Sequence, residues 1–273
     1  MAPVDYLLLR AIRHFIPAGW VKWLLKRSLI IQSGTETKDP DTAVTRYLDT
    51  LHHYDQHLKG KAVFLLGYGG RFHVGVGLLE AGASKVTFCD PFVTPDMDAA
   101  RQLSGRYPDY LRVRDGCVNI LDPRLELLSQ DVRALGDDHH RKYDFLFSSS
   151  VLEHLDAPIE ITKALAQITA KEGFHIHFID LRDHFFRYPF EMLTFNDRIW
   201  MDWLNPTSNL NRFRIADYLA AFEPVFEDVK WEALSQDVDA FMRTLPRIRP
   251  DFLSGDPAVD SITRIVLIAQ FPS

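Results

Sequence analysis

The stretch AVFLLGYGGRFHVGVGLLEAGASKVTFCDP, residues Ala62–Pro91, decides the fold of this 273-residue chain. An apolar run over residues 62–66 breaks at the sequence GYGG (67–70), and an apolar-periodic segment then continues to about Ala83. A second apolar run follows and ends at Asp90. This order predicts a strand, a glycine turn, a helix and a second strand that ends on an acidic residue.

The ends of these two strands predict a nucleoside site. Glycines at a strand end let the chain turn where a side chain would clash, and they let a ligand approach the backbone and the helix N-terminus. Asp90 lies 23 positions after Gly67, and its carboxylate can accept hydrogen bonds from both hydroxyls of a ribose. A dinucleotide fingerprint has a third glycine where this chain has Phe72, which weakens a diphosphate-binding interpretation.

The same residues resemble the first motif of the class I S-adenosylmethionine-dependent methyltransferases of the small-molecule type. The resemblance implies S-adenosyl-L-methionine as the cofactor. It implies that the ribose is held by Asp90 with Pro91, and that the methionine end of the cofactor is held by the glycine turn of Gly67, Tyr68, Gly69 and Gly70. Leu65 stands where that family usually has an acidic residue.

Two later stretches extend the resemblance. In the family, an acidic residue followed by a small or apolar one contacts the adenine, which implies this role for Asp131 and Val132. A helix-capping aspartate would give the same letters. The run YDFLFSSS (143–150), followed by VLEHLD, looks like the fourth motif and implies that Ser148 and Ser149 lie beside the cofactor's sulfur.

Candidate catalytic groups follow two predicted strands. His154 could act as a general base because the imidazole pKa lies near neutrality, or it could only orient the segment together with Glu153. Active-site groups of open α/β sheets gather outside the carboxyl ends of the strands. After the strand predicted over 174–180, we therefore predict His184 as the base if one is required, assisted by Asp183 or Asp180.

The remaining histidines do not predict a metal centre. Those of the helix predicted over Thr42–Leu58 have no carboxylate or cysteine nearby to complete a site. His175 and His177 lie inside a predicted strand rather than at its end. We expect no metal ion.

Composition narrows the class of protein. Lys+Arg 31 against Asp+Glu 37 gives a net charge of −6, which argues against nucleic acid as a partner. The two cysteines, Cys89 and Cys117, form no disulfide framework, and the N-terminus has no secretory pattern. We expect a cytoplasmic protein with a small-molecule acceptor.

The chain is predicted to consist of two regions. Residues 1–40 read as an amphipathic helical extension, with one helix around Leu8 and Ile12 and a second around Trp20 and Trp23. We favour an accessory pair or lid over a membrane-surface helix, because a core-packed helix shows the same periodicity. Residues 41–273 form the methyltransferase domain.

An aromatic-rich insertion at about 185–214 interrupts that domain, and connections of this length are usually functional or mobile. We interpret it as a substrate cover for an apolar or aromatic acceptor. The alternative is an aromatic patch that completes the core or a dimer surface.

The expected fold class is α/β. The resemblance implies a Rossmann-like, seven-stranded, mostly parallel sheet with helices on both faces. Its last strand, over Ile262–Phe271, would be antiparallel and inserted beside the strand of Phe226–Leu234. A helix is predicted over Pro158–Lys171, ended by Gly173.

The predicted function is S-adenosylmethionine-dependent methyl transfer to a small molecule. An NAD-type oxidoreductase could use the same glycine turn and Asp90, and a non-catalytic cofactor-binding protein is the third hypothesis. The sequence leaves open the acceptor, the element that is methylated and the oligomeric state.

Overall fold

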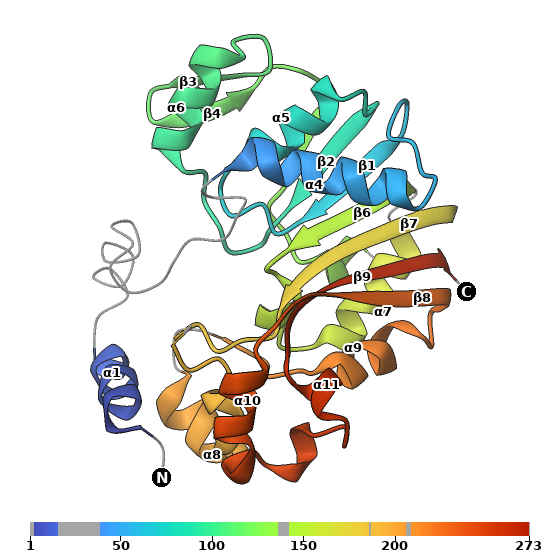
Figure 1. Cartoon of the computed structure of the whole chain (residues 1–273). Helices are drawn as coiled ribbons and strands as arrows, with labels where there is room; N and C mark the ends of the chain where they lie inside the picture. The colour runs from blue at the N-terminus through green and yellow to red at the C-terminus, as the bar shows by residue number, and fades with distance from the viewer. Residues whose placement is uncertain (1–2, 16–38, 136–141, 186, 206–208, 273) are drawn as a thin grey trace.

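A computed structural model describes residues 3–15, 39–135, 142–185, 187–205 and 209–272. Within these residues, a seven-stranded sheet runs in the order β5-β2-β1-β6-β7-β9-β8, with helices on both faces (Figure 1). Its strands are β1 (Ala62–Leu66), β2 (Lys85–Cys89), β5 (Leu125–Leu128), β6 (Tyr143–Ser149), β7 (Thr169–Asp180), β8 (Phe226–Gln236) and β9 (Ile262–Pro272).

The strand directions confirm the predicted fold class. The strands β5, β2, β1, β6 and β7 pair in parallel, whereas β9 pairs antiparallel with both β7 and β8. The last strand of the chain is thus inserted between the fifth and sixth strands of the main sheet. The central strand β1 is apolar along its whole length, and β1 and β2 are buried after their first residues, because helices cover both faces of the sheet.

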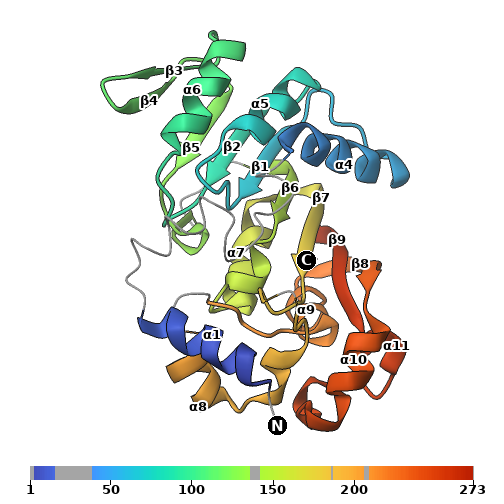
Figure 2. The ribbon, with the colours of Figure 1, turned by 60° about the vertical axis from the view of Figure 1, so that its left-hand side comes forward.

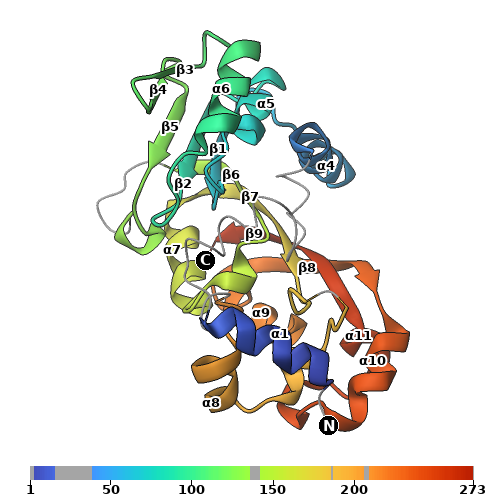
Figure 3. The same ribbon diagram turned by 90° about the vertical axis from the view of Figure 1, so that its left-hand side faces the viewer.

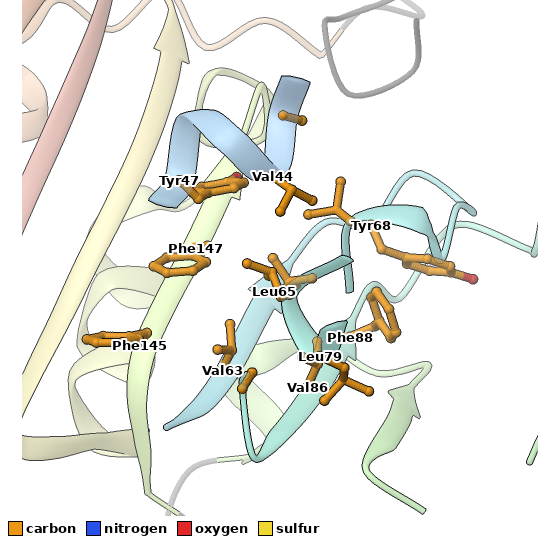
Figure 4. Close-up of a cluster of buried hydrophobic side chains, with 14 of the residues drawn as sticks. Val44, Tyr47, Val63, Leu65, Tyr68, Leu79, Val86, Phe88, Phe145 and Phe147 are labelled. Atoms are coloured by element: carbon orange, nitrogen blue, oxygen red, sulfur yellow. The ribbon is translucent and has the colours of Figure 1, made fainter. Parts of the chain in front are cut away.

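One face of the sheet is covered by α4 (Pro40–His53), α5 (His73–Glu80) and α6 (Met97–Arg106). Figure 4 shows side chains of α4 packed against those of β1, β2 and β6. The Tyr47 ring stacks on Phe147 with centroids 4.6 Å apart. Gly77 lets α5 lie close to α4, because a Cβ there would come within 2.6 Å of Val44.

The other face is covered by α7 (Pro158–Ile168) and α9 (Ile215–Phe222). Leu165 and Phe222 are buried there against Leu146 and Leu267 of the sheet. The predicted helix over Pro158–Lys171 is too long, and Gly173 does not end it. The helix gives way to β7 at Thr169, whose hydroxyl donates to the Leu165 carbonyl at 2.6 Å.

A third apolar cluster lies beyond the carboxyl end of β7. It joins η3 (Glu191–Thr194), η4 (Trp200–Leu204) and α10 (Val238–Thr244), with α8 (Asp197–Ile199) leading into η4. Phe190, Trp200 and Phe241 are buried in this cluster. Much of the aromatic content of the insertion therefore completes a core.

The first predicted N-terminal helix is α1 (Val4–Phe15), which lies beside α8 and η4 (Figures 2 and 3). The predicted helix around Trp20 and Trp23 falls outside the described residues. None of the helices in the described ranges has the length and apolar character needed to cross a bilayer.

Two local features differ from the sequence-based expectation. The helix predicted to reach Leu58 ends at His53, because Asp55 takes a left-handed conformation with φ of 59°. The region between β2 and β5 also contains a hairpin, β3 (Leu111–Arg114) and β4 (Cys117–Ile120). Its two-residue turn, Asp115-Gly116, has positive φ at both positions, as a tight hairpin with the native strand twist requires.

The other short elements lie in the connections. They are η1 (Val132–Leu135), η2 (Leu152–His154), η5 (Leu245–Arg247), η6 (Pro250–Phe252) and α11 (Pro257–Asp260).

Candidate functional site

A cavity of about 1260 Å³ opens at the carboxyl ends of β1, β2, β6 and β7. Side chains of α4 and of the insertion form its other walls. Ligands of open α/β sheets bind at this edge, because the chain leaves each parallel strand there and adjacent loops diverge. The cavity is therefore the candidate functional site.

The glycine turn after β1 borders the cavity in a left-handed backbone conformation that glycine adopts readily. Gly67, Gly69 and Gly70 all have positive φ, between 59° and 79°. A Cβ on Gly67 would lie 2.4 Å from Val151, whereas one on Gly69 would meet no atom within 4 Å. Gly67, Tyr68 and Gly69 line the cavity, but Gly70 does not; its carbonyl accepts the Asp96 amide at 2.8 Å.

Packing between α5 and β2 explains why Phe72 stands in the place of the third glycine of a dinucleotide fingerprint. Phe72 is buried and packs edge-on against Phe88 of β2 at 5.2 Å. The close approach of helix and strand occurs instead at Gly75, where a Cβ would lie 2.1 Å from the Phe88 ring. Glycine is thus required within α5, three positions later than in a dinucleotide fingerprint.

Asp90 lies at the tip of β2 and lines the cavity together with Pro91. Its Oδ1 accepts the amides of Phe92 at 3.0 Å and Val93 at 3.2 Å. These bonds leave Oδ2 available to a ligand. Phe92, next on the cavity wall, exposes 89% of its surface.

Asp131 and Val132 line the same cavity after β5. Asp131 accepts three hydrogen bonds from Arg133, one from its amide at 2.8 Å and two from its guanidinium at 3.0 and 2.6 Å. This pairing lowers the pKa of Asp131, so the carboxylate is ionised. Val132 is buried at the start of η1.

Ser148 and Ser149 end β6, and both line the cavity. The Ser149 hydroxyl accepts a hydrogen bond from Arg46 of α4 at 2.9 Å. The Arg46 guanidinium also lies 3.7 Å from the centroid of the Phe178 ring. Sequence reasoning missed Arg46, because only the packing of α4 across the sheet brings it to the cavity.

A buried relay of hydrogen bonds fixes the histidines of β7. Thr169 donates to a carbonyl, so Nε2 of His175 must donate to Thr169, at 2.9 Å. Nδ1 of His175 then accepts from Nε2 of His177 at 3.1 Å, and Nδ1 of His177 accepts from the Ser148 hydroxyl at 2.7 Å. All four ring nitrogens are engaged, so this pair does not offer a metal site.

The candidate catalytic residues divide into two groups. His154, Asp180 and His184 line the cavity, but Asp183 does not. Asp183 is fully buried and accepts hydrogen bonds from Arg10, from the Tyr6 hydroxyl at 2.6 Å and from the Phe185 amide at 2.9 Å. Since these donors occupy its carboxylate away from the cavity, we no longer propose Asp183 as an assistant to His184.

Asp180 is held by the next basic residue along the chain. It accepts from the Arg182 amide at 3.0 Å and from the guanidinium at 2.8 and 2.5 Å. The carboxylate remains an acceptor at the cavity wall.

The two cavity-lining histidines meet edge to face, with ring centroids 4.9 Å apart. Glu153 lies beside them, 3% exposed, and its carboxyl oxygens are buried without a hydrogen-bond partner of normal geometry among the described residues. Burial raises the pKa of Glu153 to about 8, with the Asp180 charge adding to the effect. Ligand atoms of Glu153, His154 and His184 all lie within 4.8 Å of one another, so these three could hold a metal ion.

The insertion holds the segment of Glu153 and His154 in place, and it also lines the cavity. The Asn211 amide donates to the Glu153 carbonyl at 2.9 Å, and its side chain donates to the Leu152 carbonyl at 2.7 Å. The insertion residues that line the cavity are of mixed polarity: Met201, Asn205, Asn209, Leu210, Asn211 and Phe213. The sequence did not single out these asparagines.

Comparison with known proteins bears on the fold. No family model matches this sequence, and no curated protein matches it. A candidate O-methyltransferase from Nostoc punctiforme matches with a TM-score of 0.51 at 13% identity, over 92% of this chain and 59% of that one. Geranyl diphosphate C-methyltransferase from Streptomyces coelicolor, solved with Mg²⁺, geranyl-S-thiolodiphosphate and S-adenosyl-L-homocysteine, matches with a TM-score of 0.50 at 12% identity, over 83% and 76%.

These matches agree with the strand order. The chain has the fold of the class I S-adenosylmethionine-dependent methyltransferases, and it spans less than two thirds of the Nostoc protein.

Proposed function

We propose that this protein transfers a methyl group from S-adenosyl-L-methionine to a small molecule. The observation that carries the proposal is the convergence of the glycine turn, Asp90 and Asp131 on one cavity in a sheet with the methyltransferase strand order. A dinucleotide sheet would continue its strands in parallel, whereas β9 here is antiparallel. The strand order therefore favours methyl transfer over an NAD-type oxidoreductase.

The nucleoside would lie between β1 and β2. In this proposal Oδ2 of Asp90 accepts from the ribose, since Oδ1 already holds the turn to Val93. The exposed Phe92 ring offers a flat apolar surface that a purine would cover. Asp131 would accept from the exocyclic amine, because a carboxylate has lone pairs beyond those that Arg133 uses.

The methionine end would lie against Gly67, Tyr68 and Gly69, where the absence of a Cβ at Gly69 leaves the backbone open to a ligand. Arg46 supplies a cation on the cavity wall that suits the cofactor's carboxylate. Ser148 suits the ammonium group, because its hydrogen is committed to His177 and its remaining lone pair can only accept. This acceptor would compensate for Leu65 in the place of an acidic residue.

The acceptor would lie at the end of the cavity that His154, Asp180 and His184 border. Methyl transfer is an in-line displacement, so positioning the nucleophile against the methyl carbon supplies most of the acceleration. A nucleophile that carries a proton must also lose it. Imidazole has the right basicity near neutral pH, which makes His184 with His154 the proposed reacting corner.

The walls of the cavity favour an acceptor with an apolar body and polar substituents. Met201, Leu210 and Phe213 supply apolar surface, and Asn209 supplies an amide that can donate and accept, whereas the buried Asn205 amide is engaged with the Leu210 backbone. The buried aromatics Phe190 and Trp200 do not line the cavity, so they would shape the cover without touching the acceptor.

The proposal is tested by cofactor binding and by product formation. Calorimetry with S-adenosylhomocysteine should show binding to the wild type and at least about tenfold weaker binding to Asp90→Ala, which removes the ribose acceptor. Asp109→Ala, at an exposed aspartate away from the cavity, serves as the matched control. Equal affinities for all three proteins would contradict the role of Asp90.

Activity needs a second experiment. Cofactor labelled in its methyl group, incubated with protein and a metabolite extract, should give a labelled product that mass spectrometry can identify. Binding without transfer into any fraction would favour a non-catalytic cofactor-binding protein.

A further inference from the structure

The reacting corner of the cavity contains a ligand set that methyl transfer by itself does not require. Glu153 and His154 come from η2, directly after β6, and His184 comes from the segment after β7. One carboxylate oxygen and two imidazole nitrogens lie within 4.8 Å of one another. Two parallel strands that end side by side bring these residues together from positions 30 apart in the sequence.

Of the three residues, Glu153 has the environment that most favours a bound cation. Its side chain is buried, and neither carboxyl oxygen has a hydrogen bond of normal geometry among the described residues. A buried carboxylate that lacks hydrogen bonds or a countercharge costs several kcal/mol, roughly, so such groups are paired or bind metals. The polar groups around it include the Ser150 side chain, the backbone at Asp180 and the imidazoles of His154 and His184, and the imidazoles in their neutral form offer lone pairs to a cation.

We propose that Glu153, His154 and His184 bind one divalent transition-metal ion of the zinc type. Imidazole nitrogens favour first-row transition metals over Mg²⁺ or Ca²⁺, and two histidines with one carboxylate leave coordination positions open. Ligands about 2.0–2.1 Å from a tetrahedral ion lie roughly 3.3 Å apart. Ligand atoms that lie within 4.8 Å of one another therefore need to approach by at most about 1.5 Å to reach that spacing around an ion.

The ion deepens the proposed function and rests on it for the chemistry that follows. A bound cation polarises an acceptor hydroxyl and lowers its pKa, so the proton passes to solvent water as the oxygen lone pair attacks the methyl carbon. The oxygen–carbon bond forms, the sulfur–carbon bond breaks and the sulfonium becomes a neutral thioether, with no oxidation or reduction. With the ion bound, the histidine lone pairs hold the metal, and the cation takes the place of a general base.

The test uses the full chain, freed of metal with a chelator and then exchanged into chelator-free buffer near neutral pH. Titration with Zn²⁺ should show one equivalent bound, and Co²⁺ should give the visible absorption of an imidazole-bound ion. Glu153→Gln and His184→Ala should each weaken Zn²⁺ binding by at least about tenfold. Glu153→Gln keeps the size of the side chain, and far-ultraviolet circular dichroism checks that each variant folds.

The exposed histidines at the end of α4 and just after it provide the control. His52, His53 and His57 lie close together in the sequence and away from the cavity, so His53→Ala should leave the tight equivalent intact. Zinc binding that Glu153→Gln and His184→Ala leave unchanged but His53→Ala abolishes would overturn the proposal. So would the absence of a stoichiometric equivalent in the folded wild type.

The readout separates this proposal from the proposed function. The protein could bind one equivalent of Zn²⁺ in a way that depends on Glu153 and yet not bind S-adenosylhomocysteine. This result would support the metal site and contradict the methyltransferase proposal. Binding of S-adenosylhomocysteine and methyl transfer without a metal equivalent would do the reverse.

Discussion

Single residues that line the cavity also hold the fold together. Asp90 closes the turn to Val93, Ser148 ends the hydrogen-bond relay of β7, and Arg46 ties α4 to Ser149. Replacing any of them changes local structure and binding together. Matched variants are therefore needed to assign an effect to the ligand.

The two cysteines are predicted to differ strongly in reactivity. Burial raises the pKa of Cys89 to about 12, with the charges of Asp90 and Asp131 adding to the effect, and its thiol donates to the Gln130 carbonyl at 3.2 Å. Cys117 is exposed. Because the thiolate is the reactive form, an aromatic disulfide reagent at about pH 8 should label one cysteine per folded chain quickly.

Cys117→Ser should abolish the fast phase, and unfolding in urea should release the second thiol. Two fast equivalents from the native wild type would show that Cys89 is accessible and that the carboxyl edge of β2 is open.

At the scale of elements, Arg10 attaches α1 to the segment after β7 by a buried ion pair and to the insertion by further contacts. Arg10 pairs with Asp183, donates to the Leu204 carbonyl at 2.8 Å and lies over the Trp200 ring at 4.7 Å. Both charged side chains are fully buried. Removing one partner of such a pair leaves the other charge in a medium of low dielectric constant.

Arg10→Met should therefore destabilise the protein by about 3–5 kcal/mol, measured by urea unfolding, and speed hydrogen exchange in α1. Arg187→Met is the matched control, because Arg187 pairs with Asp5 on the surface, and it should cost less than about 1 kcal/mol. Adding Asp183→Asn to Arg10→Met should recover part of the loss. Equal effects of the two arginine variants would contradict a buried anchor.

The second element-scale prediction concerns β7. Burial lowers the pKa of His177 to about 3 and that of His175 well below its ordinary value. Between the unfolded pKa near 6.5 and the folded value, the unfolded chain binds protons that the folded chain does not, so stability falls as the pH falls. Above about pH 6.5 both states are neutral and this effect vanishes.

Wild-type stability should accordingly drop more steeply than that of His177→Gln on acidification from about pH 6.5 to about pH 5, by up to about 1.4 kcal/mol per pH unit. Urea unfolding at several pH values measures the difference, in which groups common to both proteins cancel. Parallel curves would mean that His177 is protonated in the folded protein.

At the scale of the whole molecule, β9 lies between β7 and β8, and this strand order distinguishes the sheet from that of a dinucleotide-binding fold. The cavity is lined by residues of β1, β2, β6, β7, β8 and β9. A ligand that bridges these strands should stabilise the fold as a whole.

S-Adenosylhomocysteine at about 100 times its dissociation constant should add about 2.7 kcal/mol of stability, and it should raise the melting temperature by several degrees. NADH at the same concentration should leave it unchanged. A shift with NADH and none with S-adenosylhomocysteine would replace the methyltransferase proposal with the oxidoreductase one.

The sequence by itself determined the βαβ unit and the strand-end residues that border the cavity on the predicted cofactor side, and its family resemblance implied the inserted last strand. Apolar runs, glycines and the acidic residue at a strand tip report local backbone conformation and face, which neighbours in the chain largely decide. The places of Asp90 and Gly67 at the ends of strands could therefore be predicted from the sequence. The Asp115-Gly116 turn carried an equally local signal for a hairpin.

Only the tertiary structure decided which polar groups are available for chemistry. Asp183 reads as a strand-end carboxylate, but Arg10 from the far end of the chain occupies it. In the sequence, Glu153 is only a residue that could orient the segment together with His154, yet it is buried and its pKa is raised to about 8. Burial and pairing depend on groups brought together across the sheet, and the exclusion of water that shifts a pKa has no local signature in the sequence.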